Sequence, residues 1–157
     1  MSLNIRTLTR TFLVALGTLA LTVSIAPSAS AHSLGSAVSS SAGCNWGSSS
    51  YQILDTLALN GNETGTRYGT AYLLWNNGNG ENCVVTRRTG SAHGDPGFTA
   101  AGLYIQNKAP IEDGDSNWAH YAAVHAPARG QCVRFGGRVD HNGEIAIRIS
   151  DNYEFCS

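Results

Sequence analysis

The sequence has few charged residues, and they do not favour one sign. Only 13% of its 157 residues are Asp, Glu, Lys or Arg, and the formal net charge at pH 7 is −1. A basic stripe is the usual electrostatic signature of proteins that bind nucleic acid or an anionic membrane surface. We therefore expect no nucleic acid among the partners of this chain.

The sequence also lacks the common catalytic motifs. It contains no G-x-S-x-G nucleophile elbow, and its acidic residues form no pattern that pairs two carboxylates for hydrolysis. The histidines at 93, 120, 125 and 141 fit solvated loops or strand ends better than a shared metal site. We predict no catalytic residues, no metal and no cofactor.

The first 31 residues have the layout of a secretory signal peptide. Arg6 and Arg10 precede an apolar run over 12–25, and Ala29-Ser30-Ala31 is a small-x-small cleavage sequence. The run has about 14 residues, whereas a membrane-spanning helix needs roughly 20. We expect cleavage after Ala31, secretion and no stable membrane insertion; a retained anchor is the alternative.

Four cysteines follow this segment, at Cys44, Cys83, Cys132 and Cys156. An even number in a small exported chain predicts two disulfides. Structural zinc sites usually bring cysteines in close pairs, and no such pair occurs here. Of the three connectivities, the local pairs Cys44–Cys83 and Cys132–Cys156 close the smaller loops. The nested arrangement, Cys44–Cys156 with Cys83–Cys132, remains open.

The rest of the chain has the period of β-strands and no sustained helical stripe. Residues 32–43 are rich in Ser, Gly and Ala and predict a flexible leader, which leaves 44–157 as a single domain. Short apolar runs separated by Gly, Asn, Asp and Pro predict strands at 51–59, 69–75, 83–88, 101–105, 121–126, 132–139 and 145–149. About seven strands predict an all-β fold, either a small antiparallel sandwich or a barrel.

Two segments contain acidic residues that are candidate ligands or candidate core positions. Asp113, Asp115 and Asn117 repeat at every second residue, as the first ligands of a calcium loop do, but the later ligands of that motif are missing. An acidic turn is the better interpretation. Asp55 lies inside an apolar strand, so its carboxylate must be hydrogen-bonded, either as a structural group or as part of a site.

Three tryptophans, Trp46, Trp75 and Trp118, could act in either of two ways. They could supply core burial in a small β domain, or they could form an exposed platform on which sugar rings stack. The sequence leaves both interpretations open.

Several segments together carry a family resemblance. They are Cys44, YQILD (51–55), TAYLLWN (70–76), NCVVT (82–86), DSNW (115–118), YAAV (121–124), GQCVRFGG (130–137) and EFC (154–156). In this order, and with the four cysteines, they resemble the spore-associated protein A family of actinobacteria. The resemblance implies export and association with the aerial hypha or spore surface, and it supplies no catalytic residues.

These observations lead to three functional hypotheses. The first is a secreted, non-enzymatic protein of the cell or spore surface, whose partner is a surface glycan or protein. The second is a carbohydrate-binding module that uses exposed Trp and Tyr side chains. The third is a small secreted hydrolase or inhibitor whose site the sequence does not reveal.

Overall fold

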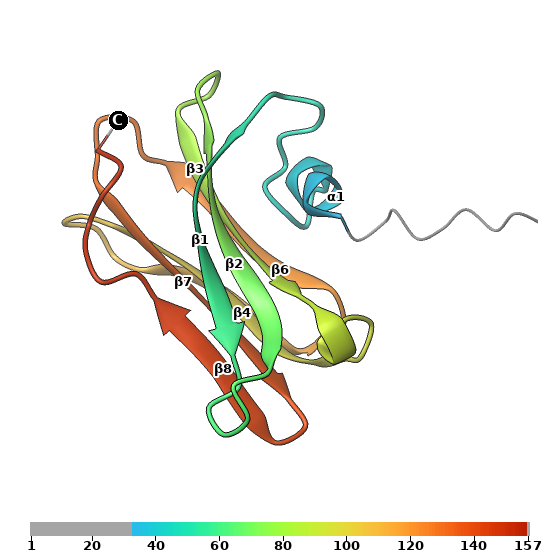
Figure 1. Cartoon of the computed structure of the whole chain (residues 1–157). Coiled ribbons are helices and arrows are strands. Elements are labelled where there is room, and N and C mark those ends of the chain that lie inside the picture. Colours follow the sequence, from blue (N-terminus) through green and yellow to red (C-terminus); the bar gives the residue numbers. More distant parts are fainter. Residues whose placement is uncertain (1–32, 157) are drawn as a thin grey trace, which may run out of the picture.

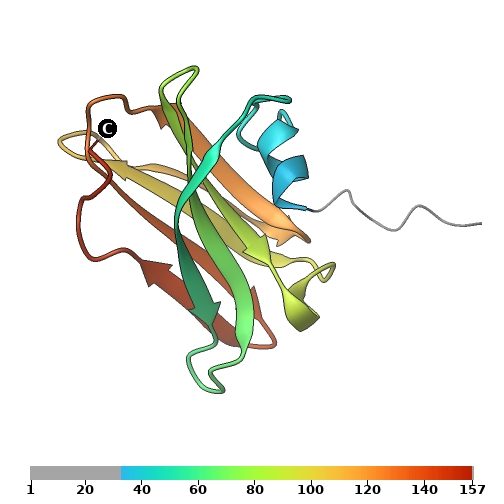
Figure 2. The same ribbon diagram turned by 45° about the horizontal axis from the view of Figure 1, so that its top comes forward.

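The structure, a computed structural model, describes residues 33–156, and the predicted signal peptide lies outside them. Two four-stranded antiparallel sheets pack face to face (Figures 1 and 2). Sheet A has the strand order β1-β2-β3-β6, and sheet B has the order β5-β4-β7-β8. Of the two predicted architectures, the chain therefore adopts the sandwich.

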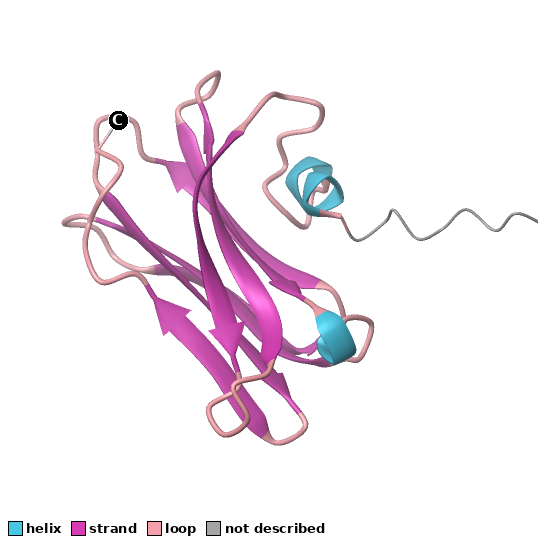
Figure 3. Cartoon of the chain, in the orientation of Figure 1, coloured by secondary structure: helices cyan, strands magenta, loops and turns pink. Residues whose placement is uncertain are grey.

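The strands account for most of the described chain (Figure 3). They are β1 (Gln52–Asn60), β2 (Arg67–Asn76), β3 (Glu81–Arg88), β4 (Gly97–Ile105), β5 (Ile111–Trp118), β6 (Tyr121–Pro127), β7 (Val133–His141) and β8 (Glu144–Ile149). A helix, α1 (Leu34–Ser39), precedes them, and a 3-10 turn, η2 (Gly90–Ala92), connects β3 to β4. The seven predicted strands correspond to β1–β4 and β6–β8, and the all-β prediction is confirmed.

The main core lies between the two sheets. Alternate residues of each strand point inward, so that Leu73 and Val84 of sheet A pack with Leu103, Val133 and Phe135 of sheet B. All five side chains are almost completely buried. This alternation is the physical basis of the strand predictions.

Strand β5 is a correction to the predicted acidic turn. Asp113 pairs with Ala101 and Gly114 with Ala100, at the edge of sheet B. An edge strand tolerates acidic residues because one side of it faces water, and charge there discourages pairing with other chains. Along an extended strand, Asp113, Asp115 and Asn117 cannot wrap one ion. Within residues 33–156, no group of three or more His, Cys, Asp or Glu side chains could hold a metal.

The N-terminal part of the described chain differs from the flexible leader that its composition predicted. Ser33 caps α1 by accepting a hydrogen bond from the amide of Ser36, and Ala37 and Val38 are buried. Gly43 is required here, because a Cβ atom at this position would collide with the carbonyl oxygen of Ala37. Tertiary contacts therefore order a segment whose local sequence favours flexibility.

Both disulfides join the locally paired cysteines. Cys44 bonds to Cys83 and Cys132 to Cys156, so the local connectivity is confirmed and the nested one is wrong. In the described part of the chain, no helix is both long enough and apolar enough to pass through a bilayer.

Candidate functional site

The two outer faces of the sandwich differ in how far other parts of the described chain cover them. The outer face of sheet A is covered by α1 and the turns that follow it (Figures 1 and 2). Ala37, Val38 and Trp46 pack there against Leu74 and Val85 and form a second apolar cluster. The outer face of β2, β3 and β6 is therefore part of the folded interior.

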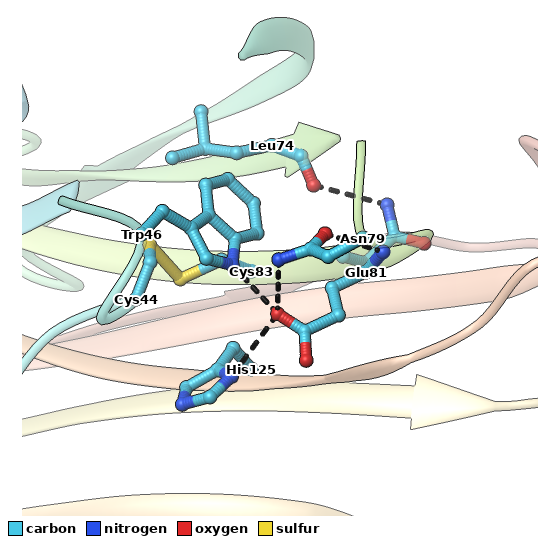
Figure 4. Close-up of a disulfide and its surroundings, with 8 residues drawn as sticks. Cys44, Trp46, Leu74, Asn79, Glu81, Cys83 and His125 are labelled. Atoms are coloured by element: carbon cyan, nitrogen blue, oxygen red, sulfur yellow. Dashed lines mark hydrogen bonds and ion pairs between the residues drawn. A yellow bond between two sulfur atoms is a disulfide. The ribbon is translucent and has the colours of Figure 1, made fainter. Parts of the chain in front are cut away.

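A polar clasp holds this cover in place (Figure 4). The Cys44–Cys83 disulfide ties the N-terminal segment to β3. Beside it, the Glu81 carboxylate accepts hydrogen bonds from the Trp46 indole (2.7 Å) and the Asn79 amide (2.8 Å), and it lies 3.6 Å from Nδ1 of His125. Since its oxygen already has these partners, Glu81 acts as an anchor. Sequence reasoning missed it because Trp46 is 35 residues away in the chain.

The outer face of sheet B has no such cover among the described residues. We call this surface the sheet B face. It consists of the outward positions 98, 100, 102 and 104 of β4, 112 and 114 of β5, 134, 136, 138 and 140 of β7, and 145, 147 and 149 of β8. A partner that binds this face would contact side chains that no other described part of the chain covers.

The centre of the sheet B face is a trough with a floor of small residues. Ala100 lies opposite Gly114, and Gly102 lies opposite Gly136. The open volume above them is about 310 Å³, within the usual range of ligand sites. A Cβ atom at Gly102 would lie 2.7 Å from the Tyr104 hydroxyl, so the tyrosine side chain extends across this glycine. The missing side chains therefore create the hollow.

Polar groups hold both ends of the trough. At one end the Tyr104 hydroxyl donates to Glu112 at 2.7 Å; burial, reinforced by this bond, raises the pKa of Tyr104 to about 12. At the other end, Arg138 lies 4.8 Å from the centre of the Phe98 ring and forms two 2.7 Å bonds with Asp140. The hydrogen bonds to Asp140 raise the pKa of Arg138. Both ends are thus preorganised.

A stripe of isoleucines forms one side of the trough. The exposed fractions of Ile145, Ile147 and Ile149 are 41%, 57% and 39%, whereas Ala146 between them is fully buried. In a half-buried strand the larger apolar side chains normally face the core. Here β8 reverses that rule and exposes its most apolar residues. Large apolar side chains that face solvent in this way are typical of functional surfaces.

The three predicted aromatic residues do not share a face. Trp46 and Trp75 are buried, with exposed fractions of 5% and 7%, while Trp118 is 37% exposed at the end of β5. Trp75 lies under the guanidinium of Arg129, at 5.8 Å. Two of the three indole rings thus belong to the packing of sheet A, and a common stacking platform is not formed.

The other candidate residues are also separated. Asp55 is half-buried at a β-bulge, where its carboxylate accepts a hydrogen bond from the amide of Thr56 at 2.7 Å. His141 ends β7 but is buried, contrary to the solvated position expected, with its Nδ1 3.2 Å from Asp95. His125 belongs to the polar clasp. These residues lie on different elements and do not converge on one cleft.

Comparison with known proteins gives one informative match. No family model matches the chain, and no solved structure matches it either. Spore-associated protein A from Streptomyces coelicolor is 32% identical over 118 residues, which cover 71% of this chain and 66% of that protein. The match therefore spans just under two thirds of the relative's length.

Proposed function

Because this chain belongs to the spore-associated protein A family, we propose that it is exported and acts at the cell or spore surface by binding rather than by catalysis. The relationship and the two disulfides fit a surface or extracellular location. The signal peptide predicted over 1–31 supplies the route of export. The binding surface in this proposal is the sheet B face.

One observation carries the proposal, namely the contrast between the two outer faces. The chain uses a helix, a disulfide and a buried indole to cover sheet A, yet it leaves three isoleucines exposed on sheet B. Apolar groups in contact with water are unfavourable by roughly 25 cal/mol per Å² relative to burial. A patch that the fold leaves open at this cost favours a partner that covers it.

The apolar stripe favours a protein partner, and a second feature favours a glycan. Ile145, Ile147 and Ile149 offer aliphatic surface, which suits another protein. Tyr104 and Glu112 offer a ring beside a carboxylate, the combination that sugar hydroxyls and ring faces can use. Both features lie on the sheet B face, so the same set of variants tests them.

The test is surface association of the exported chain. We expect the wild-type chain to remain with washed spores or hyphae, and Ile147→Glu to shift it into the medium because a carboxylate would then be desolvated on binding. Ile53→Glu is the matched control, since Ile53 is 51% exposed but lies on β1 of sheet A. Equal retention of Ile147→Glu and wild type would overturn the proposal.

A glycan array separates the two partner classes. If the partner is a glycan, Tyr104→Ala and Glu112→Gln should abolish binding to specific array members, while Ile53→Glu should not. Retention on spores without any array signal would favour a protein partner.

A further inference from the structure

The sheet B face is self-complementary, and we propose that it docks a second copy of the same chain about a two-fold axis perpendicular to its strands. This inference rests on the proposed function, because it names the partner of the same face. Strand register determines which side chains lie opposite each other when two such faces are placed together.

Register arranges the centre of the face in two adjacent rows. Positions 114, 100, 138 and 147 form one row across β5, β4, β7 and β8, and positions 112, 102, 136 and 149 form the next. A two-fold axis that lies between these rows, in the plane of the interface, places each row against the other row of the second copy. Each strand then faces its own equivalent.

This rotation places large residues of one copy opposite small residues of the second copy, or opposite apolar residues where both are apolar. Arg138 faces Gly136 of the second copy, and Glu112 faces Gly114. Ile147 faces Ile149, so the exposed stripe of β8 is covered by the same stripe. Face-to-face sheets pack about 10 Å apart with interdigitated side chains, which requires this kind of pairing.

The ends of the face are complementary in the same way. Tyr104 and Arg134 are directly paired at one end, while Phe98 and Asp140 lie at the other. The rotation brings Arg134 against Asp140 of the second copy and Tyr104 against Phe98. The register therefore places residues of opposite charge, and two aromatic residues, opposite each other across the interface.

The alternative axis, parallel to the strands, gives a poorer match. It exchanges β5 with β8 and β4 with β7, so that Ile149 would face Glu112 of the second copy. The apolar stripe of β8 would then lie against the acidic edge strand β5 instead of against itself, so less apolar surface would be paired. The perpendicular axis is therefore the arrangement that the face supports.

The size of the face indicates a weak dimer. From residue 98 to 104 it extends about 20 Å, and four strands span about 14 Å. The flat footprint is therefore about 280 Å² per copy, well below the roughly 800 Å² per partner of a standard interface, so association should be weak and depend on concentration. Helix α1 covers the opposite sheet and does not obstruct this approach.

Sedimentation equilibrium of the oxidised, exported chain over a wide concentration range tests the inference. We expect the mass to rise towards that of a dimer. Ile147→Glu should raise the dissociation constant by roughly tenfold or more, because each copy loses apolar contact on β8. Ile53→Glu should leave it unchanged. Circular-dichroism melting of each variant verifies that the monomer is folded.

Arg134→Glu distinguishes the two axes. It should weaken the dimer, because the perpendicular axis places residue 134 against Asp140, whereas the parallel axis places it against Tyr104. A wild-type chain that stays monomeric at every concentration, or a dimer unaffected by Ile147→Glu, would overturn the inference. A dimer unaffected by Arg134→Glu would overturn the perpendicular arrangement.

The two proposals fail in different ways. If wild type is monomeric but Ile147→Glu is lost from spores, the sheet B face binds another partner and only the self-docking inference fails. If Ile147→Glu abolishes the dimer but not retention on spores, the face serves assembly and the proposed function fails.

Discussion

Arg88 joins the two sheets through a fully buried guanidinium, and its removal should destabilise the domain strongly. The side chain leaves the end of β3 and donates to Ala92 O (2.8 Å), Thr99 Oγ1 (2.9 Å), Asp140 O (3.2 Å) and Phe98 O (3.3 Å). Three of these acceptors belong to β4 or β7 of sheet B. Arg88 is fully buried, and this burial lowers the pKa of its guanidinium.

The magnitude follows from the acceptors that Arg88→Met would leave without a donor. Each unsatisfied buried acceptor costs about 1–3 kcal/mol. The carbonyls retain part of their bonding, and the loss of a desolvated cation offsets some of the cost. We expect a net loss of about 3 kcal/mol and a fall in Tm of roughly 10 °C. Arg88→Lys keeps the charge without the planar fork and should lose about half as much.

Urea unfolding followed by tryptophan fluorescence measures this loss with the disulfides intact. Arg87→Met is the matched control, since the neighbouring Arg87 points to the other face of β3 and is only half-buried; we expect less than about 1 kcal/mol. If Arg88→Met unfolds at the same urea concentration as wild type, the cost of desolvating the cation cancels its hydrogen bonds and the reasoning is wrong.

Three further predictions follow from other residues. The Glu144 carboxylate accepts bonds from the Thr64 amide and the Tyr68 hydroxyl, which lower its pKa from 4.5 to about 2; stability that is present above pH 4.5 should be lost as pH falls towards 2, and Glu144→Gln should flatten this part of a Tm-against-pH curve. Replacing both Cys44 and Cys83 with serine should lower the free energy of unfolding by about 2–4 kcal/mol; an unchanged value in urea titration would show that packing alone holds the N-terminal cover. Mass spectrometry of the protein recovered from culture medium should find a chain that begins at His32, and a chain that begins at Met1 would contradict the predicted cleavage.

The local sequence pattern predicted the strands in which apolar and polar residues alternate, and it missed β5, in which they do not. Strand β4 was predicted because Ala101, Leu103 and Ile105 alternate with outward residues, and all three are buried. Strand β5 carries Glu, Asp, Gly and Asn, residues that are depleted in strands, and its pairing with β4 determines its conformation. Tertiary context therefore overrode local preference at the sheet edge.

The candidate site was the least predictable part of the molecule. The trough consists of small residues from three strands, and no short motif connects Gly102, Gly114 and Gly136. The isoleucines of β8 were visible as a strand, but alternation alone does not say which face is buried. Of the three tryptophans for which core and binding roles were both open, Trp46 and Trp75 pack inside the fold, and Trp118 is partly exposed.

A signal-like start, an even number of cysteines and short alternating runs were enough to predict an exported, disulfide-bonded β domain. These features are local or compositional, so they can be read along the chain. Three further features became clear only in the folded chain: which cysteines join, that α1 covers sheet A, and that Ile147 faces outward. Each of these depends on contacts between residues distant in sequence, and the free energy of such contacts exists only when both sheets are in place.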